Sequence, residues 1–283
     1  MKTVIAEDDG LPALVYVSNK RYLYLGRTQL RIRDLHSAAA SLLVCLDGTV
    51  KFRASSAQLW NSAKSLLIPA GSRISIDNQG AVLAACYLDA AKADFLLLKR
   101  KMESVSDGVY FNLPGERQLA DSLIRLRDDA PGFAEAQQRM ESLLQQCAGS
   151  AMASGDSRVA HVVDRLRHTA SLNISVKQLA AEVGLSESGL IRLFSLHVGA
   201  PLRRHRLWYR LIDFVELTLA GVPVAAAIKA SGFTDAAHLS RCYSAFFGVH
   251  FSYAFSRRTN ARYVVDACPA GSARDTAPIS RQQ

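Results

Sequence analysis

The stretch LAAEVGLSESGLIRLF, residues 179–194, decides the fold of the C-terminal third of this chain. Just before it, Ser175 to Gln178 have the pattern of a capping box, in which the serine side chain accepts from a free amide at the helix start and the glutamine reaches back. The helix that begins there should end at Gly184, and Ser186 should start a second helix that ends at Gly199. Two short helices joined by a tight glycine turn predict a helix-turn-helix unit.

The second helix of this unit has two distinct faces. Leu190 and Phe194 are four residues apart, so we expect both to point into the core. A different face follows the i, i+3, i+4, i+7 spacing and should look outward, into a groove of double-stranded DNA. Its members are Ser188, Ile191, Arg192 and Ser195.

The same arrangement recurs further along the chain, which predicts a second helix-turn-helix unit. At an offset of 48 or 49 residues, Gly184, Leu190, Arg192, Phe194 and Gly199 are echoed by Gly232, Leu239, Arg241, Tyr243 and Gly248. An internal repeat is harder to obtain by chance than a single motif. Between the two copies, residues 201–219 predict a helix of about 28 Å. One turn of DNA is about 34 Å, so this spacer could place two recognition helices in successive major grooves.

Several cations lie where they can contact DNA. Arg203, Arg204 and Arg206 crowd the first turn of the spacer helix, where the helix dipole disfavours cations. With Lys177, they are candidate phosphate contacts, the alternative being a solvated charge cluster. Arg192 and Arg241 are candidates for reading guanine in two places at once, although either could pair with a carboxylate or phosphate instead.

The second unit offers mainly small outward side chains. Its remaining candidates for base contacts are Ala236, Ala237, His238 and Ser240. Small groups can touch a thymine methyl or nothing, so we expect this unit to contribute position and phosphate contact more than base choice.

Charge and composition are consistent with a DNA-binding C-terminal region. The 283 residues carry a formal net charge of +9, and residues 155–265 hold 14 basic against 7 acidic side chains, whereas residues 1–154 hold 18 against 16. A concentrated positive face attracts a polyanion.

The sequence also bears on where the protein acts. The five cysteines lie far apart, which suggests reduced thiols. Residues 7–9 are acidic where a secretory leader would be apolar, and no apolar run approaches a bilayer span. We therefore expect a cytoplasmic protein, associated with the nucleoid through DNA, with no cofactor.

The N-terminal part reads as β-strands. Short apolar runs separated by turns extend from Leu14 to Asp89 and predict a sandwich or barrel. Asp47-Gly48 is a hairpin signature because glycine tolerates the positive φ of a tight turn. Pro69-Ala70-Gly71 marks a second turn.

After Ala90 the pattern becomes helical, and it ends in a heptad seam. The seam, which could face a second subunit or simply pack on the preceding β-domain, consists of Phe133, Gln137, Met140, Leu144 and Cys147. Small residues at 149–155 mark a boundary, and residues 266–283 read as a loose tail. The expected division is a β-domain at 1–90, helices at 91–148, a double helix-turn-helix domain at 156–260 and the tail.

At these residues the sequence resembles the AraC/XylS family of bacterial transcription regulators. The resemblance covers about Ser157 to Phe255 and includes both units and their spacing: LAAEVGLSESGLIRLF, then VGAPL and the arginine-rich spacer, then SGFTDAAHLSRCYSAFFG. It implies an α+β protein with an all-α double helix-turn-helix domain, base contacts from the outward faces of both recognition helices, a homodimer and contact with RNA polymerase.

Residues 14–89 look, more generally, like the cupin-type sensing domain that precedes many such regulators. That resemblance implies a small effector inside the barrel, for which the candidate lining residues are Tyr22, Tyr24, His36, Trp60 and Tyr87, each of which could equally be plain core or rim. The H-x-H signature of cupin enzymes is missing after His36, so we expect no metal site.

Three functions follow as hypotheses. The first is a dimeric, effector-responsive transcription regulator, either activator or repressor. The second keeps the DNA binding but gives the N-terminal part a protein partner in place of a small molecule. The third is an enzyme, a cupin oxygenase or a DNA repair protein with a reactive cysteine, for which the sequence offers neither metal ligands nor a cysteine beside a histidine.

Overall fold

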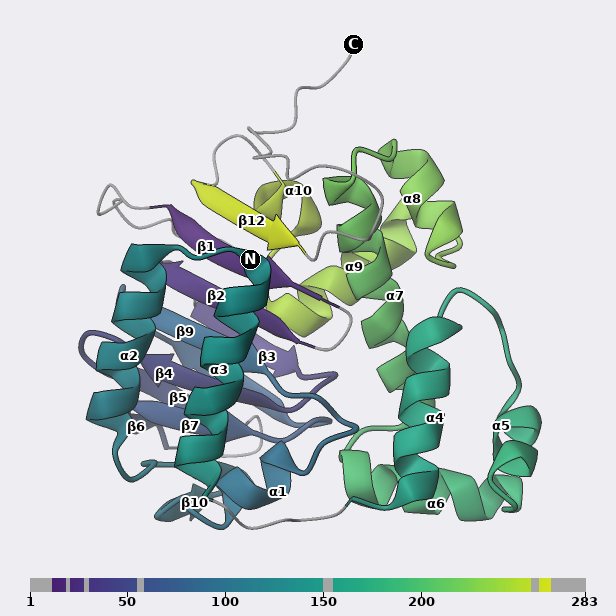
Figure 1. Cartoon of the computed structure of the whole chain (residues 1–283), viewed down its shortest axis with the longest axis horizontal. Coiled ribbons are helices and arrows are strands. Elements are labelled where there is room, and N and C mark those ends of the chain that lie inside the picture. The colour runs from purple at the N-terminus through teal and green to yellow at the C-terminus, as the bar shows by residue number, and fades with distance from the viewer. Residues whose placement is uncertain are drawn as a thin grey trace.

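The computed structural model of the chain describes residues 12–18, 21–27, 31–54, 59–149, 155–255 and 260–265. It has a β-rich N-terminal part and a helical C-terminal part, as the sequence predicts (Figure 1). The acidic start at residues 7–9, the boundary residues 150–154 and the predicted tail at 266–283 lie outside the described residues. Within the described ranges, no helix is both long and apolar enough to cross a membrane.

The strands of the described residues form a large sheet of eight strands and a small sheet of four. The large sheet has the order β10-β11-β7-β4-β9-β2-β1-β12, and the small sheet has the order β3-β8-β5-β6. In chain order the strands are β1 (Ala13–Val17), β2 (Tyr22–Arg27), β3 (Arg31–His36), β4 (Ser41–Cys45), β5 (Val50–Ala54), β6 (Asn61–Ala63), β7 (Ser65–Ile68), β8 (Arg73–Asp77), β9 (Val82–Tyr87), β10 (Ser104–Ser106), β11 (Val109–Phe111) and β12 (Ala261–Val265).

Helices cover the large sheet and build the C-terminal domain. α1, α2 and α3 follow β9 in the chain and belong to the N-terminal part, whereas α4 to α10 form the C-terminal domain (Figure 1). Their bounds are α1 (Asp94–Lys99), α2 (Glu116–Asp129), α3 (Phe133–Ala148), α4 (Ser157–His168), α5 (Val176–Glu182), α6 (Glu187–Val198), α7 (Leu202–Leu219), α8 (Val224–Ala230), α9 (Ala236–Phe247) and α10 (Phe251–Ala254).

The two faces of the large sheet are buried by different partners. Alternate residues of a strand point to opposite faces, so on β2 Leu23 and Leu25 pack in the core under α2 and α3, while Tyr22 points the other way. On that second face, the strands from β11 to β9 pack against the small sheet around buried Phe52 and Ile74. The small sheet therefore covers part of this face and leaves the rest for another partner.

Two predictions for the N-terminal part need correction. Asp47-Gly48 is a turn, with Gly48 at φ +80°, but it joins β4 to β5, which lie in different sheets, so it is not a hairpin. The Asp47 carboxylate accepts from the backbone N–H of Val82 and pairs with Arg27 at 2.8 Å, which ties the turn to the large sheet while the chain crosses to the small one. In the segment 91–148, expected to be helical, β10 and β11 form a hairpin that extends the large sheet.

The heptad seam of α3 lies mostly against its own domain. Met140 and Leu144 are buried in the core that α2 and α3 share with the large sheet, together with Ala136 and Ala148. Phe133, Gln137 and Cys147 are half-buried at its margin. Of the two interpretations of this pattern, packing on the β-domain accounts for its buried positions, and a dimer contact stays a prediction.

The two helix-turn-helix units have the same construction. α5 and α8 each contain seven residues, and α6 and α9 each contain twelve. Gly184 and Gly232 adopt positive φ in the two turns, and Gly199 and Gly248 are left-handed C-caps of the recognition helices α6 and α9. The capping box at Ser175 is present. α7, of 18 residues, joins the units and spans about 27 Å.

The C-terminal helices cover the rest of the second face of the large sheet. Tyr22 of β2 pairs in register with Tyr87 of β9, so both point to the same face. Tyr87 stacks on Trp208 of α7, with ring centroids 4.8 Å apart, and both tyrosines contact Phe247 of α9. The large sheet and the helix-turn-helix domain therefore share one apolar core.

A buried ion pair adds a polar link across the same interface. Arg167 of α4 donates to the carboxylate of Asp89, after β9, at 2.8 Å, and both side chains are buried. Removal of Arg167 would leave the buried Asp89 carboxylate without its cation, which costs about 3–5 kcal/mol. The pair therefore favours one relative position of the two domains over positions in which the two side chains cannot meet.

The C-caps of both recognition helices touch the N-terminal domain. A Cβ placed on Gly71, in the turn after β7, would lie 2.5 Å from the carbonyl oxygen of Gly199. A Cβ placed on Gly248 would lie 2.3 Å from Ile32 of β3. Glycine is needed at these positions for close approach as well as for positive φ. The β-domain thus holds the C-terminal ends of α6 and α9.

The contact at Gly71 can be tested against a matched glycine. Gly48 has nearly the same φ (+80° against +82°), but a Cβ added there would meet nothing within 4 Å. Gly48→Ala should cost about 1–2 kcal/mol of unfolding free energy from left-handed strain alone. Gly71→Ala should cost a further 1–3 kcal/mol, roughly, because backbone of the other domain must move. Equal losses in urea unfolding would show that the domain contact at Gly71 is unimportant.

Candidate nucleic-acid interface and interdomain cavity

The outward face of α6 is formed as the sequence predicts. Leu190 and Phe194 are fully buried, whereas Ser188, Ile191 and Arg192 are exposed, and Ser195 is half-buried. Ile191 leaves 47% of its surface to solvent. Within the described residues, no hydrogen bond or ion pair is found for the guanidinium of Arg192. This face can therefore offer both an apolar contact and a cation to a groove.

The corresponding face of α9 is smaller and more constrained. Ala236, Ala237 and Arg241 are exposed, and His238 and Ser240 are half-buried. The backbone N–H of His238 donates to the capping carboxylate of Asp235 at 2.7 Å. The imidazole lies 3.3 Å from the hydroxyl of Thr234 and edge-on to Phe233. His238 is thus held by its own unit, and Arg241 is the more available polar side chain.

The four predicted phosphate contacts divide into two pairs. Lys177 and Arg203 are exposed. The sequence led us to expect Arg204 and Arg206 at the surface, but both are half-buried. Each donates to a backbone carbonyl at 2.5 Å, Arg204 to that of His36 and Arg206 to that of Ile174. Burial lowers the pKa of both guanidinium groups below the usual value. Lys177 and Arg203 remain the available phosphate ligands in this arrangement.

Arg204 connects the two domains. It is on α7, yet it donates to the carbonyl of His36 at the end of β3, and its guanidinium lies 4.8 Å from the ring centroid of Phe246 on α9. A cation over an aromatic face is stabilised by the ring quadrupole. Arg204, which the sequence made a candidate phosphate contact, therefore serves the domain interface in this structure.

The five predicted effector-pocket residues do not line one pocket. Tyr22 and Tyr87 are in the shared core between the domains, and Tyr24 is half-buried beside it. His36 is half-buried under Arg204, and Trp60 is 45% exposed beneath the guanidinium of Arg53. The reason is that apolar side chains fill the space between the two sheets, where the predicted pocket would have been.

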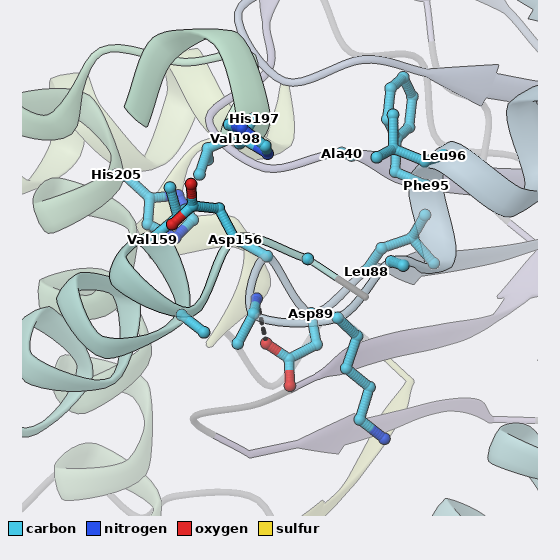
Figure 2. A pocket seen from close by; sticks show the side chains of 16 residues that line it. Ala40, Leu88, Asp89, Phe95, Leu96, Asp156, Val159, His197, Val198 and His205 are labelled. Carbon is cyan, nitrogen blue, oxygen red and sulfur yellow. Dashed lines mark hydrogen bonds between the residues drawn. The ribbon is translucent and has the colours of Figure 1, made fainter. Parts of the chain in front are cut away.

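A small cavity of about 40 Å³ lies instead between the domains (Figure 2). It is bounded by the loop from β9 to α1, the start of α4, the end of α6 and one histidine of α7. Its lining residues are Ala40, Leu88, Asp89, Ala90, Ala91, Lys92, Ala93, Phe95, Leu96, Gly155, Asp156, Val159, Ala160, His197, Val198 and His205. Since one water needs about 10–15 Å³, the cavity has room for a few waters or a small polar group.

His205 is the most deeply buried polar group of this cavity. It is 1% exposed, and neither ring nitrogen has a hydrogen-bond partner among the described residues. Desolvation lowers the pKa of His205 to about 4, although the Ala38 carbonyl and Asp89 oppose the shift. Opposite it, Asp89 accepts from the backbone N–H of Ala91 at 3.0 Å (Figure 2). The neutral imidazole can donate and accept one hydrogen bond each toward an occupant.

Sequence reasoning missed this cavity because no motif marks it. Asp89 follows a strand and His205 lies within an arginine-rich helix start, 116 positions apart. In the described part of the chain, no cluster of three or more histidine, cysteine or acidic side chains could hold a metal ion. Burial raises the pKa of Cys45 to about 12 and that of Cys86 to about 11, which makes these thiols poor nucleophiles.

Comparison with known proteins places the fold. Residues 179–260 match the family described as "Helix-turn-helix domain". A ligand-free point variant of ToxT from Vibrio cholerae superposes with a TM-score of 0.56 at 8% identity, covering 84% of this chain and 98% of ToxT. ToxT with a bound unsaturated fatty acid gives a TM-score of 0.53 at 9% identity, with 84% and 95% covered. Curated protein sequences gave no match. The chain thus shares the two-domain ToxT fold.

The burial of His205 predicts a pH-dependent stability. Because its folded-state pKa of about 4 lies below the unfolded value of about 6.5, the unfolded chain takes up a proton that the folded chain excludes. Stability should therefore fall between about pH 6.5 and pH 4, by up to roughly 3 kcal/mol from this residue. Urea unfolding at several pH values measures how the unfolding free energy depends on pH. His205→Leu should lose this part of the pH dependence, while the exposed-site control His250→Leu should keep it. Identical slopes in all three proteins would contradict the assignment.

Proposed function

Since its C-terminal region is a helix-turn-helix domain of the AraC type behind a β-rich domain, we propose that this chain is a sequence-specific transcription regulator. The observation that carries the proposal is the pair of equally built units whose recognition helices expose polar faces and one arginine each. A guanidinium in the major groove can bond guanine at O6 and N7 together. The protein would act in the cytoplasm, associated with the nucleoid through the promoter DNA that it binds.

The two units play unequal parts in this proposal. α6 presents Ser188, Ile191 and Arg192 and reads most of the sequence, and Ser195 lies at the edge of that face. α9 contributes Arg241, while Ala236, Ala237, His238 and Ser240 mainly set position. Lys177 and Arg203 bind phosphates. The support is the exposure of these residues, together with the ties of His238 to Thr234 and Phe233.

The interdomain cavity is the proposed effector site. ToxT has been crystallised with an unsaturated fatty acid and with (E)-4-(8-methylnaphthalen-1-yl)but-3-enoic acid. In this chain the cavity is small and lined by His205, Asp89 and Asp156, which favours a small hydrogen-bonding molecule over a long acyl chain unless the domains separate. An occupant would touch α4, α6 and α7 and the β-domain together, so its binding energy would bias how the domains sit.

Dimerisation and contact with RNA polymerase complete the proposal. Because Met140 and Leu144 of α3 are buried in their own domain, a dimer formed through this helix would use its other side, where Glu135, Gln138 and Ser142 are accessible. We propose no enzymatic activity, since the matched family is a DNA-binding domain. A protein partner for the N-terminal domain is the alternative to a small effector.

Substitution of the two reading arginines tests the DNA-binding mechanism. Arg192→Ala and Arg241→Ala should each weaken binding to a selected DNA site by about 1–3 kcal/mol and relax base preference at one position. Arg203→Ala should weaken binding to all sequences and lower the salt slope by about 1, because one phosphate contact is lost. Titration by fluorescence anisotropy at several salt concentrations measures both effects.

The control for these variants is Arg125→Ala, an arginine on the outer surface of α2 that hydrogen-bonds within its own helix to Ser122. It should leave affinity and salt slope unchanged. Wild-type affinity in both Arg192→Ala and Arg241→Ala would reject the proposed reading mechanism. A lower affinity of Arg125→Ala would mean that general charge, and not the two units, drives binding.

Filling the cavity tests the effector site. A small polar metabolite that binds there should stabilise the full chain by about 2.7 kcal/mol at one hundred times its Kd, seen as a higher Tm. Ala160→Leu, which fills the cavity from α4, should abolish that shift, and Ala181→Leu on the exposed side of α5 should retain it. A ligand that still stabilises Ala160→Leu binds elsewhere. If neither metabolites nor an unsaturated fatty acid stabilise the wild-type chain, the protein-partner alternative is favoured.

A further inference from the structure

We propose that β12 is a strap that fastens the DNA-binding domain to the N-terminal sheet and restrains the separation of the two domains. β12 pairs in parallel with β1 at all five positions, from Ala13 opposite Ala261 to Val17 opposite Val265. The backbone N–H of Ala13 also donates to the carbonyl of Asn260 at 2.8 Å. The last described strand of the chain is therefore an edge strand of the sheet that contains the first (Figure 1).

The parallel pairing has a topological consequence. Two parallel neighbours in a sheet need a crossover connection, and here that connection includes the entire helix-turn-helix domain. The domain is thus attached to the N-terminal part at both ends: through the chain that leads from α3 into α4, and through β12. A tether at one end permits rotation about it, whereas a second tether at the other end opposes rotation.

The side chains of β12 join both apolar cores. Ala261, Tyr263 and Val265 pack on the core shared by the sheet and the C-terminal helices. Val264 points to the other face and packs on the core under α2 and α3. This alternation is that of a strand with apolar partners on both faces, so β12 contributes to domain contact through side chains as well as through its backbone ladder.

Tyr263 links the strap to the second recognition helix. Its hydroxyl donates to the carbonyl of Ala254 in α10 at 2.8 Å, and its ring stacks on Phe255 at 5.4 Å with an interplanar angle of 10°. Phe255 in turn contacts Tyr243 of α9 at 6.2 Å. The aromatic contacts therefore run from the strap to the buried face of α9, whose C-terminal end meets the β-domain at Gly248.

Release of the strap would have a defined effect on the DNA-binding surface. In the strapped arrangement Arg204 is held on the His36 carbonyl, and Gly199 lies against Gly71. Separation of the domains would free the Arg204 guanidinium for phosphate and allow α6 and α9 to change their relative orientation. This consequence for DNA rests on the proposed function, whereas the fastening of the domains does not.

Truncation tests the fastening without DNA. A chain ending at residue 265 keeps β12 and should unfold in calorimetry as the full chain does. A chain ending at residue 259 lacks β12 and should show two separated transitions, with faster amide exchange in β1 and α9 than in the matched control. A single transition at the same Tm as the chain of residues 1–265, with unchanged exchange, would overturn the proposal.

A reversible staple tests the strap in the full chain, in case the shorter truncation fails to fold. Val17 and Val265 are register partners, so Val17→Cys with Val265→Cys should form a disulfide that holds β12 in place. Oxidation should weaken DNA binding at least about fivefold relative to the reduced protein, the lower end of usual coupling. Val265→Cys alone controls for other cysteines and should not respond to oxidation. Equal affinities of the oxidised and reduced double variant would contradict the restraint.

The two experiments separate failure of the strap from failure of the proposed function. If the wild-type chain binds no DNA, the proposed function fails, and the calorimetric comparison of residues 1–259 with 1–265 still decides whether β12 fastens the domains. If the wild-type chain binds DNA but the double variant binds equally well when oxidised and when reduced, and the chains of residues 1–259 and 1–265 unfold alike, the strap proposal fails and the proposed function stands.

Discussion

The structure depends on the apolar face of the large sheet that the small sheet leaves uncovered. Tyr22 and Tyr87 lie there, and without a partner they would expose a broad aromatic surface to water. Trp208 of α7 and Phe247 of α9 cover them, so the core of the N-terminal domain is completed by the C-terminal one. Because apolar attraction is not directional, the buried Asp89–Arg167 pair and the close glycine contacts are what select one register of the domains.

This arrangement connects the two recognition helices to the N-terminal domain through short paths. α6 is anchored at Gly199, α9 at Gly248, and α7 carries both Trp208 and Arg204 into the interface. A change in the contact between the domains therefore acts on each recognition helix directly at its C-cap residue. The cavity beside His205 lies at the same junction, which makes it a position from which a small occupant can favour one domain arrangement over another.

Local patterns predicted the C-terminal domain well. The capping box at Ser175 and the paired glycines act within a few residues, so the sequence determines them without knowledge of the fold. Pairing between distant strands follows no such local rule. Asp47-Gly48 has the sequence of a hairpin turn but joins strands of two different sheets, and β12 pairs with β1 although almost the whole chain separates them. For the same reason local patterns left open whether Tyr22 and Tyr87 line a pocket or lie in the core, and made Arg204 a candidate phosphate contact. The domain interface uses all three.

Joint reading of DNA by two unequal helix-turn-helix units is the hypothesis on which the proposed function stands. Selection of bound sites from a random DNA library with the full chain tests it without any substitution. We predict a bipartite site whose halves are spaced by about one helical turn, roughly 10–10.5 base pairs, with the half read by α6 better specified than the half read by α9. Recovery of no enriched sequence, or of two equally specified halves, would contradict it.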